Sequence, residues 1–497
     1  MRRARDASPG GPGLAGVRRL REGRTVIRLT AAAARRTASR RTAGSRGVAA
    51  RRPRVTRPAV ALVLLALTAA ACSGGGTGTE AEDRPVTVLG TWTAGQEDAF
   101  RALLDKSGVD YVYQGTAAQR EVLLSQVKSG SPPDIAVMAS PGELADYVRE
   151  GELQPLDGLY EPSQYGEPWQ PRVSRTRQNY MVPVKADLKS IVWYREDEPP
   201  RGGTPPAEDW CIGMGDDGAS GWPGTDWIED ILLQQGHGTE TYEKWAGGVQ
   251  SWTSRPVADA WRTWGAMLTR ERGPKDRYPA AERALSNDHR GEPGSSGLLF
   301  GGGKKPLGAR GEKRAPECSL EHQGSFARTF YGRKHAADAR FVRSSGLLPG
   351  GPYGKGQQQR HEVSADFAAM FTSTPASRKL MAYLASAAVQ QRWVRTNEPP
   401  VHSFSANSGV DDRSYEDAVS RSISARLTDQ DSVRCLDASD TMPPAVRDAF
   451  YETALRFLTR PARDPHDLLE DIQRVQDVER EKLGLGDGEK WMTDVCG

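Results

Sequence analysis

The sequence predicts an α/β fold, because strand-like and helix-like runs alternate along its first folded stretch. The strand-like runs occupy residues 84–92, 109–116 and 133–142. The amphipathic, helix-like runs that follow them occupy residues 95–108, 117–130 and 143–151. This alternation is typical of parallel sheets, in which ligands bind at the carboxyl ends of the strands. Those ends carry Trp92 and Thr93, Gly115 and Thr116, and Ser140 and Pro141.

The remaining periodic segments extend the same prediction over a chain of 497 residues, which is long enough for two or three domains. A strand-rich stretch is predicted at 180–194, and helices are predicted at 226–236, 257–268, 374–394, 443–458 and 465–483. Asp226 and Glu229 have the spacing of a capping box at the start of a helix. Trp227, Trp261 and Trp264 fall on apolar helix faces and are predicted to be buried. Residues 294–314 have the composition of a loop-rich insertion.

The charge of the chain excludes a nucleic-acid-binding role. The net charge of +3 is positive only because of the leader: 17 of the 67 basic residues and 2 of the 64 acidic residues lie in 1–71. That distribution leaves 50 basic and 62 acidic residues from Cys72 onward. Binding to nucleic acid requires a basic face on the folded part of a protein, and a net charge of −12 argues against one.

The leader has the organisation of an export signal. A basic stretch at 51–58 precedes a short apolar run at 59–71, which is too short to span a bilayer comfortably. Cys72 follows directly, and a Gly-rich tether continues to residue 84. This arrangement resembles a bacterial lipoprotein signal, in which Cys72 becomes lipidated after cleavage; an ordinary secretory signal is the alternative. The Arg- and Ala-rich residues 1–47 are expected not to be translated, since a start at Val48 would leave a signal of normal length.

No motif in the sequence predicts catalysis. The chain lacks a G-x-S-x-G elbow, an H-E-x-x-H motif, a Walker loop and a Gly-rich dinucleotide fingerprint. Its seven histidines show no metal-ligand spacing. We therefore expect no catalytic residues, no metal and no cofactor. Two carboxylates suffice for a glycosidase, however, and in a chain this acidic their presence does not discriminate.

Several segments together resemble the extracellular solute-binding proteins (family 1) of carbohydrate ABC importers, and most closely the alpha-glucoside-binding branch. The segments that carry this resemblance are "VTVLGTWTAGQEDAF" (86–100), "PPDIAVMASPGELADYVREGELQPLD" (132–157), "VPVKADLKSIVWY" (182–194), "CIGMGDDGASGWPGTDWIEDILL" (211–233), "ECSLEHQGSF" (317–326) and "AMFTSTPASRKLMAYLAS" (369–386). The resemblance implies a periplasmic-binding-protein-like fold, with two α/β lobes joined by a hinge around a central ligand cleft.

The resemblance also implies how the chain divides between the lobes. Lobe one would comprise residues 85–184 and 349–397, and lobe two would comprise residues 185–348 and 398–497. Four cysteines remain after Cys72, and an even number in an exported chain predicts two disulfides. Three pairings are possible; we favour Cys211–Cys318 and Cys435–Cys496, because each pair then lies within one lobe. Zinc binding is the alternative, but no C-x-x-C spacing supports it.

In this family an aromatic ring stacks on a sugar while polar side chains bind its hydroxyl groups. The corresponding positions here are Trp92, Thr93, Gln96, Glu97, Ser140, Lys185, Asp187, Ser220, Trp222, Thr225, Asp226, His322 and Gln323. Two of these have structural alternatives: Asp226 as a helix cap, and Lys185 as an ion-pair partner of Asp187. Asp366 is not assigned to the ligand.

The function that the resemblance implies is capture of a sugar, an oligosaccharide or an alpha-glucoside, and its delivery to an ABC permease. The protein is expected to be a monomer that is held by its lipid on the extracytoplasmic face of the cell membrane. Its partners would be the sugar, the transmembrane subunits of the permease and the membrane. Two alternatives come from other classes: a secreted carbohydrate-active hydrolase, and a sugar-binding receptor or adhesion protein outside transport.

Overall fold

The computed structural model describes residues 84–235, 238–270, 277–301, 318–349, 358–395 and 402–497. The chain divides into two compact units, residues 1–74 and 75–497. All described residues belong to the second unit. The predictions for the leader, for Cys72 with its tether and for most of the insertion at 294–314 therefore lie outside the described residues.

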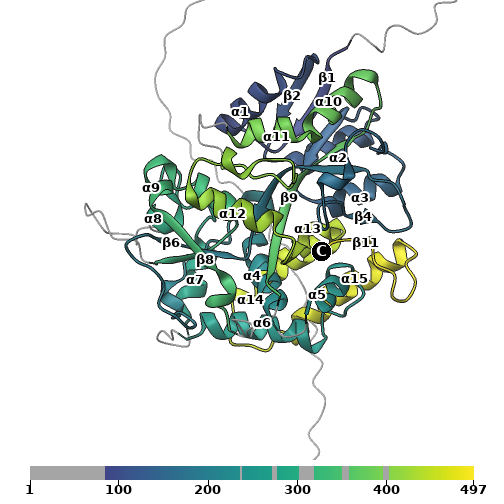
Figure 1. The fold of residues 1–497 in the computed structure, drawn as a ribbon. Helices are drawn as coiled ribbons and strands as arrows, with labels where there is room; N and C mark the ends of the chain where they lie inside the picture. Colours follow the sequence, from purple (N-terminus) through teal and green to yellow (C-terminus); the bar gives the residue numbers. More distant parts are fainter. Residues whose placement is uncertain (1–83, 236–237, 271–276, 302–317, 350–357, 396–401) are drawn as a thin grey trace, which may run out of the picture. The chain divides into compact units, whose positions relative to one another are not determined.

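A six-stranded sheet forms the centre of the α/β architecture (Figure 1). Its strands are β1 (Val86–Gly90), β2 (Tyr111–Gly115), β3 (Ile135–Met138), β5 (Met181–Leu188), β9 (Arg360–Met370) and β10 (Val433–Leu436). As the sequence predicted, β1 pairs in parallel with both β2 and β3. Strand β9 runs antiparallel to β3 and to β5 but parallel to β10, which makes the sheet mixed.

Helices follow the first three strands as predicted. They are α1 (Ala94–Leu104), α2 (Gln119–Lys128) and α3 (Pro141–Arg149). The single helix predicted over 374–394 is wrong, because the structure has two helices there, α10 (Pro375–Ala385) and α11 (Ala387–Val394). Ser386 separates them with an extended backbone at φ −75° and ψ 140°. Its backbone N–H and its hydroxyl both donate to the Tyr383 carbonyl, at 3.1 and 2.8 Å, and close the end of α10.

A second sheet of three antiparallel strands has the order β7-β6-β8. Its strands are β6 (Ile191–Arg195), β7 (Leu320–His322) and β8 (Ala339–Arg343). The predicted stretch 180–194 thus supplies strands to both sheets, since β5 ends at Leu188 and β6 begins at Ile191. A third, two-stranded sheet pairs β4 (Arg172–Val173) with β11 (Met492–Thr493). Strand β5 continues across the expected lobe boundary at 184/185, where its pairing with β9 shifts register between Pro183 and Lys185, and the lobe boundaries stay a prediction.

Helices from the middle and the end of the chain complete the fold (Figure 1). They are α4 (Trp222–Gln234), α5 (Gly238–Ala246), α6 (Arg255–Leu268), α7 (Pro279–Ser286), α8 (Gly297–Gly301), α9 (Gly332–Asp338), α12 (Ala418–Thr428), α13 (Ala438–Thr441), α14 (Pro444–Leu458) and α15 (His466–Lys482). Trp227, Trp261 and Trp264 are buried, as predicted. None of the helices in the described residues combines the length and apolar character that a bilayer span needs.

The start of α4 corrects the prediction for Asp226. The helix begins at Trp222 instead of Asp226, so the predicted capping box is wrong and Asp226 lies in the second turn. Gly221 is the N-cap at φ +114°, a conformation that favours glycine, and a Cβ there would lie 2.4 Å from the Tyr451 carbonyl oxygen. Pro223 follows in the first turn, where its fixed φ suits a helix and its missing N–H has no partner to lose.

Two disulfides connect segments that are distant in sequence. Cys211 is bonded to Cys318, and Cys435 is bonded to Cys496. This is the pairing that the sequence favoured. The first bond joins the segment before α4 to the residue that precedes β7 by two positions. The second joins β10 to the penultimate residue of the chain, so that it fixes the C-terminus to the edge of the six-stranded sheet.

Candidate functional site

A cavity of about 330 Å³ lies where strands β1 and β3 end, next to β5 and β9. It is lined by Thr91, Trp92, Gln96, Ala139, Lys185, Asp187, Lys189, Trp222, Phe326, Thr329, Phe330, Ser364, Ala365, Asp366, Asp437, Ser439, Asp440 and Tyr451. Thr91 and Ala139 directly follow β1 and β3. The cavity therefore occupies the position at which parallel α/β sheets bind ligands.

The Trp222 ring forms an aromatic wall of the cavity, and neighbouring side chains fix its orientation. Its indole Nε1 donates to a carboxylate oxygen of Asp216 at 2.7 Å. The His289 ring meets it edge-on at 4.9 Å between centroids. The Lys189 ammonium lies 5.2 Å from the ring centroid, within the range of a cation–π interaction. These contacts fix the orientation of the ring and leave it partly exposed.

Trp92 also borders the cavity, but from within a packed aromatic cluster. Only 3% of its surface is exposed. Its ring lies 4.6 Å from that of Phe100 and 4.7 Å from that of Trp393. Of the two tryptophans that the sequence assigned to the ligand, Trp222 therefore has the freer ring. Trp92 joins the cavity wall to the core beside β1.

The polar side chains of β5 and β9 form an ion-pair network in the cavity wall. The Lys185 ammonium lies 2.5 Å from Asp187 Oδ2 and 3.7 Å from Asp366 Oδ2. Asp187 accepts a second hydrogen bond, at 2.6 Å, from the Ser325 hydroxyl. Burial raises the pKa of Asp366 to about 6, although the charge of Lys185 acts in the opposite direction. Lys185 is thus a structural ion-pair partner and lines the cavity at the same time.

Lys189, whose ammonium lies beside the Trp222 ring, holds a second charge network. Its ammonium lies 3.0 Å from Asp226 and also contacts Asp437. Burial raises the pKa of Asp226 to about 8, against the effect of Lys189. For Asp437 burial acts in the same direction, but the Lys189 charge and the Ser439 hydroxyl outweigh it and lower the pKa. One ammonium therefore stabilises mainly one carboxylate, that of Asp437.

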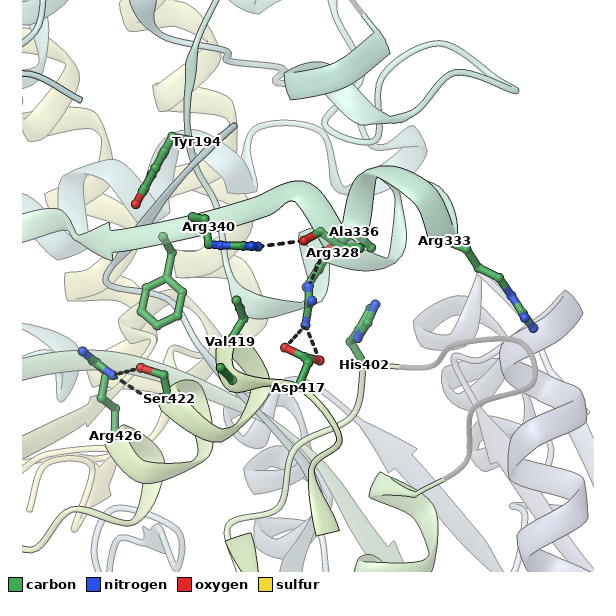
Figure 2. A pocket seen from close by; sticks show the side chains of 13 residues that line it. Tyr194, Arg328, Arg333, Ala336, Arg340, His402, Asp417, Val419, Ser422 and Arg426 are labelled. Carbon is green, nitrogen blue, oxygen red and sulfur yellow. Dashed lines mark hydrogen bonds and ion pairs between the residues drawn. The ribbon is translucent and has the colours of Figure 1, made fainter. Parts of the chain in front are cut away.

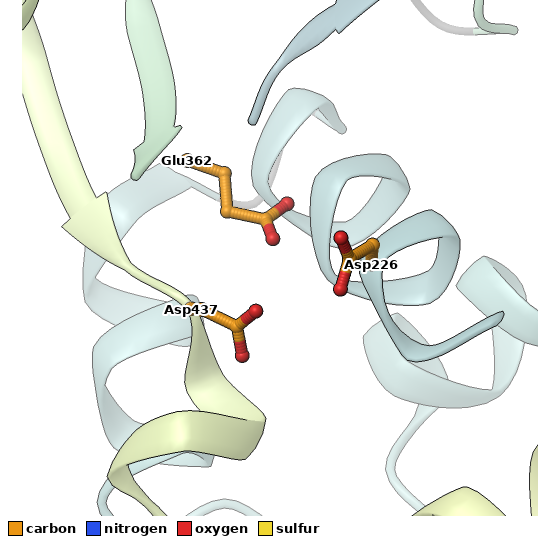
Figure 3. Close-up of side chains that lie close together, drawn as sticks. All are labelled: Asp226, Glu362 and Asp437. Carbon is orange, nitrogen blue, oxygen red and sulfur yellow. The ribbon is translucent and has the colours of Figure 1, made fainter. Parts of the chain in front are cut away.

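Glu362 brings a third carboxyl group to this network. In Figure 3 its side chain points toward Asp226 and Asp437, and the three residues have oxygen atoms within 4.8 Å of one another. Neither oxygen of Glu362 has a hydrogen-bond partner. Burial and the neighbouring Glu229 raise its pKa well above the usual value, so its neutral form is favoured. The Lys189 ammonium supplies positive charge at this place, and a metal ion bound to all three groups would have to displace it.

The structure brings together five of the thirteen predicted ligand residues in the cavity lining. They are Trp92, Gln96, Lys185, Asp187 and Trp222. The other eight lie outside that lining: Thr93, Glu97, Ser140, Ser220, Thr225, Asp226, His322 and Gln323. Their ligand contacts stay a prediction, and the structure shows other contacts for most of them.

Four of these eight residues, from the ends of α1, α3 and α4, have local partners. Glu97 pairs with Arg101 one turn further along α1 at 2.7 Å. The Ser140 hydroxyl caps α3 and donates to the Asp440 carbonyl at 3.0 Å. The Ser220 hydroxyl accepts from the Asp216 amide, and the Thr225 hydroxyl donates to the Trp222 carbonyl. Their contacts position the segments around the cavity.

The residues from the second cysteine segment are buried behind the cavity. His322 Nε2 lies 2.8 Å from Asp230 Oδ2, and its ring lies 4.4 Å from that of Trp227. The Gln323 side chain donates to the His289 carbonyl at 3.4 Å. His322 therefore joins β7 to α4, which carries Trp222 at its first position.

Sequence reasoning missed several lining residues, some of which follow a pattern in the sequence. Lys189 continues the alternation of the predicted residues Lys185 and Asp187, and alternate strand residues share one face. Asp437, Ser439 and Asp440 follow β10, as ligand-facing residues follow strands elsewhere in the sheet. Phe326 and Phe330 are four residues apart. Asp366 lies directly opposite Lys185 in the β5–β9 register, which only the strand pairing reveals.

Comparison with known proteins gives consistent matches. Residues 92–296 match the family described as bacterial extracellular solute-binding protein. The chain is 28% identical over 415 residues to the osmoprotective compounds-binding protein GgtB of Synechocystis, covering 78% of this chain and 91% of that protein. It is 29% identical over 353 residues to the alpha-glucosides-binding periplasmic protein AglE of Rhizobium meliloti, covering 64% and 72%.

The fold has equally clear matches among solved structures. The bacterial solute receptor AcbH, which prefers β-D-galactopyranose exclusively, superposes with a TM-score of 0.57 at 16% identity, over 80% of this chain and 99% of the receptor. At this identity the match establishes the fold, which is that of periplasmic-binding-protein-like sugar receptors. The fold class predicted from the sequence is confirmed.

Proposed function

We propose that this chain, which matches the bacterial extracellular solute-binding protein family over residues 92–296, binds a sugar and delivers it to an ABC importer. The observation that carries this proposal is the composition of the 330 Å³ cavity. One wall presents the Trp222 ring, and the others present the ion-paired side chains of Lys185, Asp187 and Asp366. An aromatic face beside fixed polar groups is the combination that carbohydrate recognition requires.

The chemistry of a sugar matches these two kinds of wall. A pyranose ring has an apolar C–H face, which an indole ring covers favourably, and a rim of hydroxyl groups. Carboxylates accept from those hydroxyl groups, and ammonium groups donate to them. A buried polar group that finds no partner costs about 1–3 kcal/mol, so a ligand lacking one matched hydroxyl group binds more weakly. We infer an oligosaccharide or an alpha-glucoside as the ligand, in keeping with the name of the relative AglE.

Delivery to the importer would use a two-lobed closure. A ligand that contacts both lobes only when they are closed shifts the population toward the closed state by its differential affinity. The closed, loaded protein would then dock on the transmembrane subunits of a permease. Lipidation of Cys72 would keep a monomeric protein on the outer face of the membrane, near that permease.

A panel of saccharides tests the proposal. We expect isothermal titration calorimetry with maltose, trehalose and longer alpha-glucans to show saturable binding of at least one of them at one site per chain. Chromatography of the sugar after long incubation should recover it unchanged. Binding followed by attachment to cell-wall material without any role in uptake would favour the receptor or adhesion alternative.

One observation supports a hydrolase as the second candidate. Asp366 and Asp440 both line the cavity, and burial raises the pKa of each carboxyl group. A carboxyl group with a raised pKa is what glycosidases use as the general acid. Shortened saccharides in the chromatography would identify this activity, and Asp440→Asn would then abolish it.

We expect Asp366→Asn to remove a pH dependence of stability. The pKa of Asp366 is higher in the folded protein, about 6, than in an unfolded chain, so the protonated form stabilises the fold. This contribution is fully present below about pH 4 and is lost as the pH rises through about 6. Urea unfolding of the wild type and of the variant at pH 4 to 8 measures the difference between their free energies of unfolding.

The control for that series is Asp98→Asn, at a position on α1 that is exposed to solvent. The difference between wild type and Asp366→Asn should change sign or shrink between pH 4 and pH 8, whereas the difference for Asp98→Asn should stay within about 0.5 kcal/mol. A constant difference for Asp366→Asn over the whole range would contradict the raised pKa.

A further inference from the structure

A second cavity, of about 540 Å³, lies apart from the proposed sugar site (Figure 2). Its lining comprises Tyr194, Arg328, Arg333, Ala336, Ala337, Arg340, Phe341, His402, Asp417, Ala418, Val419, Ser422 and Arg426. These residues come mainly from β6, α9, β8 and α12, and none of them lines the first cavity. The proposed sugar-binding function makes no use of this cavity.

The lining is strongly cationic in a chain whose folded part is acidic. Four arginines line the cavity, and Asp417 is the one carboxylate among the lining residues. Arg328 neutralises that carboxylate with two hydrogen bonds, of 3.1 and 3.0 Å. Arg340 pairs with Glu196 at 2.7 Å, and the Glu196 side chain is 59% exposed. The cavity wall therefore keeps an excess of positive charge over its own carboxylate.

Arg426 on α12 contributes to this positive charge, and its guanidinium has only part of its hydrogen-bond donors satisfied. Its Nη1 donates to the carbonyl and the hydroxyl of Ser422, both at 2.6 Å, as Figure 2 shows. Its Nε is buried without a hydrogen-bond partner, and within the described part of the chain no carboxylate forms an ion pair with it. Burial and the charge of Arg343 lower the pKa of Arg426, and the charge of Asp429 only partly offsets them. A bound anion would relieve both the unpaired donor and the repulsion between the two guanidinium groups.

The surroundings of Arg426 also suit an anion that carries an organic body. The guanidinium carbon lies 5.2 Å from the Phe341 ring centroid, a stacking contact that leaves the edge of the guanidinium free to donate. Tyr194 and Val419 add apolar surface. In Figure 2, Arg340 projects from β8 on the side of the cavity opposite to α12, which carries Arg426. Arg340 Nη1 donates to the Ala337 and Ala339 carbonyls at 2.7 and 3.0 Å and its Nη2 pairs with the exposed Glu196, so Arg340 adds positive charge to its side of the cavity.

We propose that this second cavity binds a phosphate-bearing ligand, whose oxygen atoms accept hydrogen bonds from Arg426, while Arg340 adds positive charge across the cavity. A phosphoryl group offers three oxygen acceptors and matches the forked donors of guanidinium groups. Phe341, Tyr194 and Val419 would contact the rest of the ligand. Such a group occurs in free phosphate esters and in phospholipid headgroups, and the experiment separates the two sources.

Titration calorimetry of the full folded protein with inorganic phosphate and with glycerol phosphate, at low ionic strength and without sugar, tests the proposal. The wild type should show saturable one-site binding. Arg426→Gln should weaken it at least fivefold, and the matched control Arg378→Gln, an exposed arginine on α10, should leave it unchanged. No saturable binding to the wild type, equal binding by Arg426→Gln, or equal loss in both variants would overturn the proposal.

Two further experiments complete the test: a second variant and a vesicle-binding assay. If Arg426→Gln fails to fold, Arg343→Gln is the second variant, because Arg343 is exposed and its positive charge acts at Arg426. Loss of that charge should weaken phosphate binding by a measurable factor. An unchanged phosphate affinity would count against the site. Co-sedimentation with phosphatidylglycerol and phosphatidylcholine vesicles identifies a headgroup if the wild type binds the vesicles and Arg426→Gln does not. Saccharide binding should be the same in Arg426→Gln and the wild type.

Discussion

Replacing Lys189 by methionine is expected to lower the free energy of unfolding by about 3–5 kcal/mol. The ammonium is buried and lies between Asp226 and Asp437, with Glu362 pointing toward the same place. Methionine has a similar volume but no charge, so it would leave these acids without a counterion in the protein interior. The loss is therefore electrostatic, and it exceeds what the packing of the side chain contributes.

Urea unfolding followed by tryptophan fluorescence measures this loss. Lys106→Met, at an exposed position after α1, is the matched control and should change stability by less than about 0.5 kcal/mol. Combining Lys189→Met with Asp437→Asn should restore part of the stability. The second substitution removes the carboxylate of Asp437, whose pKa Lys189 lowers. A Lys189→Met protein as stable as the control would show that the ammonium is not the counterion of the network.

Trp222→Ala is expected to weaken sugar binding at least about tenfold, since stacking on an aromatic face and the burial that accompanies it contribute about 1–3 kcal/mol. The effect should be selective for this ring. Trp222→Phe keeps an aromatic face and should retain part of the affinity, although it loses the hydrogen bond to Asp216. Calorimetry with the tightest saccharide of the panel gives both values.

The control for that series is a tryptophan outside the cavity wall. Trp252 lies in the core, where its indole donates to Gln476, so Trp252→Phe should change stability but not sugar affinity. An unchanged binding isotherm for Trp222→Ala would remove this ring from the site. Equal losses in Trp222→Ala and Trp252→Phe would mean that the affinity reports on folding alone.

Much of the fold was predictable because strand and helix periods are local properties of the sequence. The runs at 84–92 and 95–108 became β1 and α1 with small changes at their ends. The errors came from effects that periodicity does not contain. One serine, Ser386, divides a continuous apolar pattern into two helices, and Gly221 with Pro223 starts α4 four residues before the first acidic residue suitable as a cap.

The candidate site was predictable where a residue lies just beyond a strand or beside a Pro-Gly turn at the start of a helix, as with Trp92 and Trp222. It was not predictable where tertiary pairing decides the environment. Asp226 was expected to face a ligand, but the second turn of α4 directs it to Lys189 in the interior. Asp366 was left unassigned, yet the β5–β9 register places it opposite Lys185, within the cavity wall.

Calorimetric titration of the wild-type protein with the saccharide panel, followed by chromatography of the recovered sugar, tests the central claim most directly. The account predicts saturable binding to a single site, recovery of the saccharide at its original length, and loss of binding in Trp222→Ala. Heats indistinguishable from dilution for every saccharide, or recovery of shortened products, would contradict it.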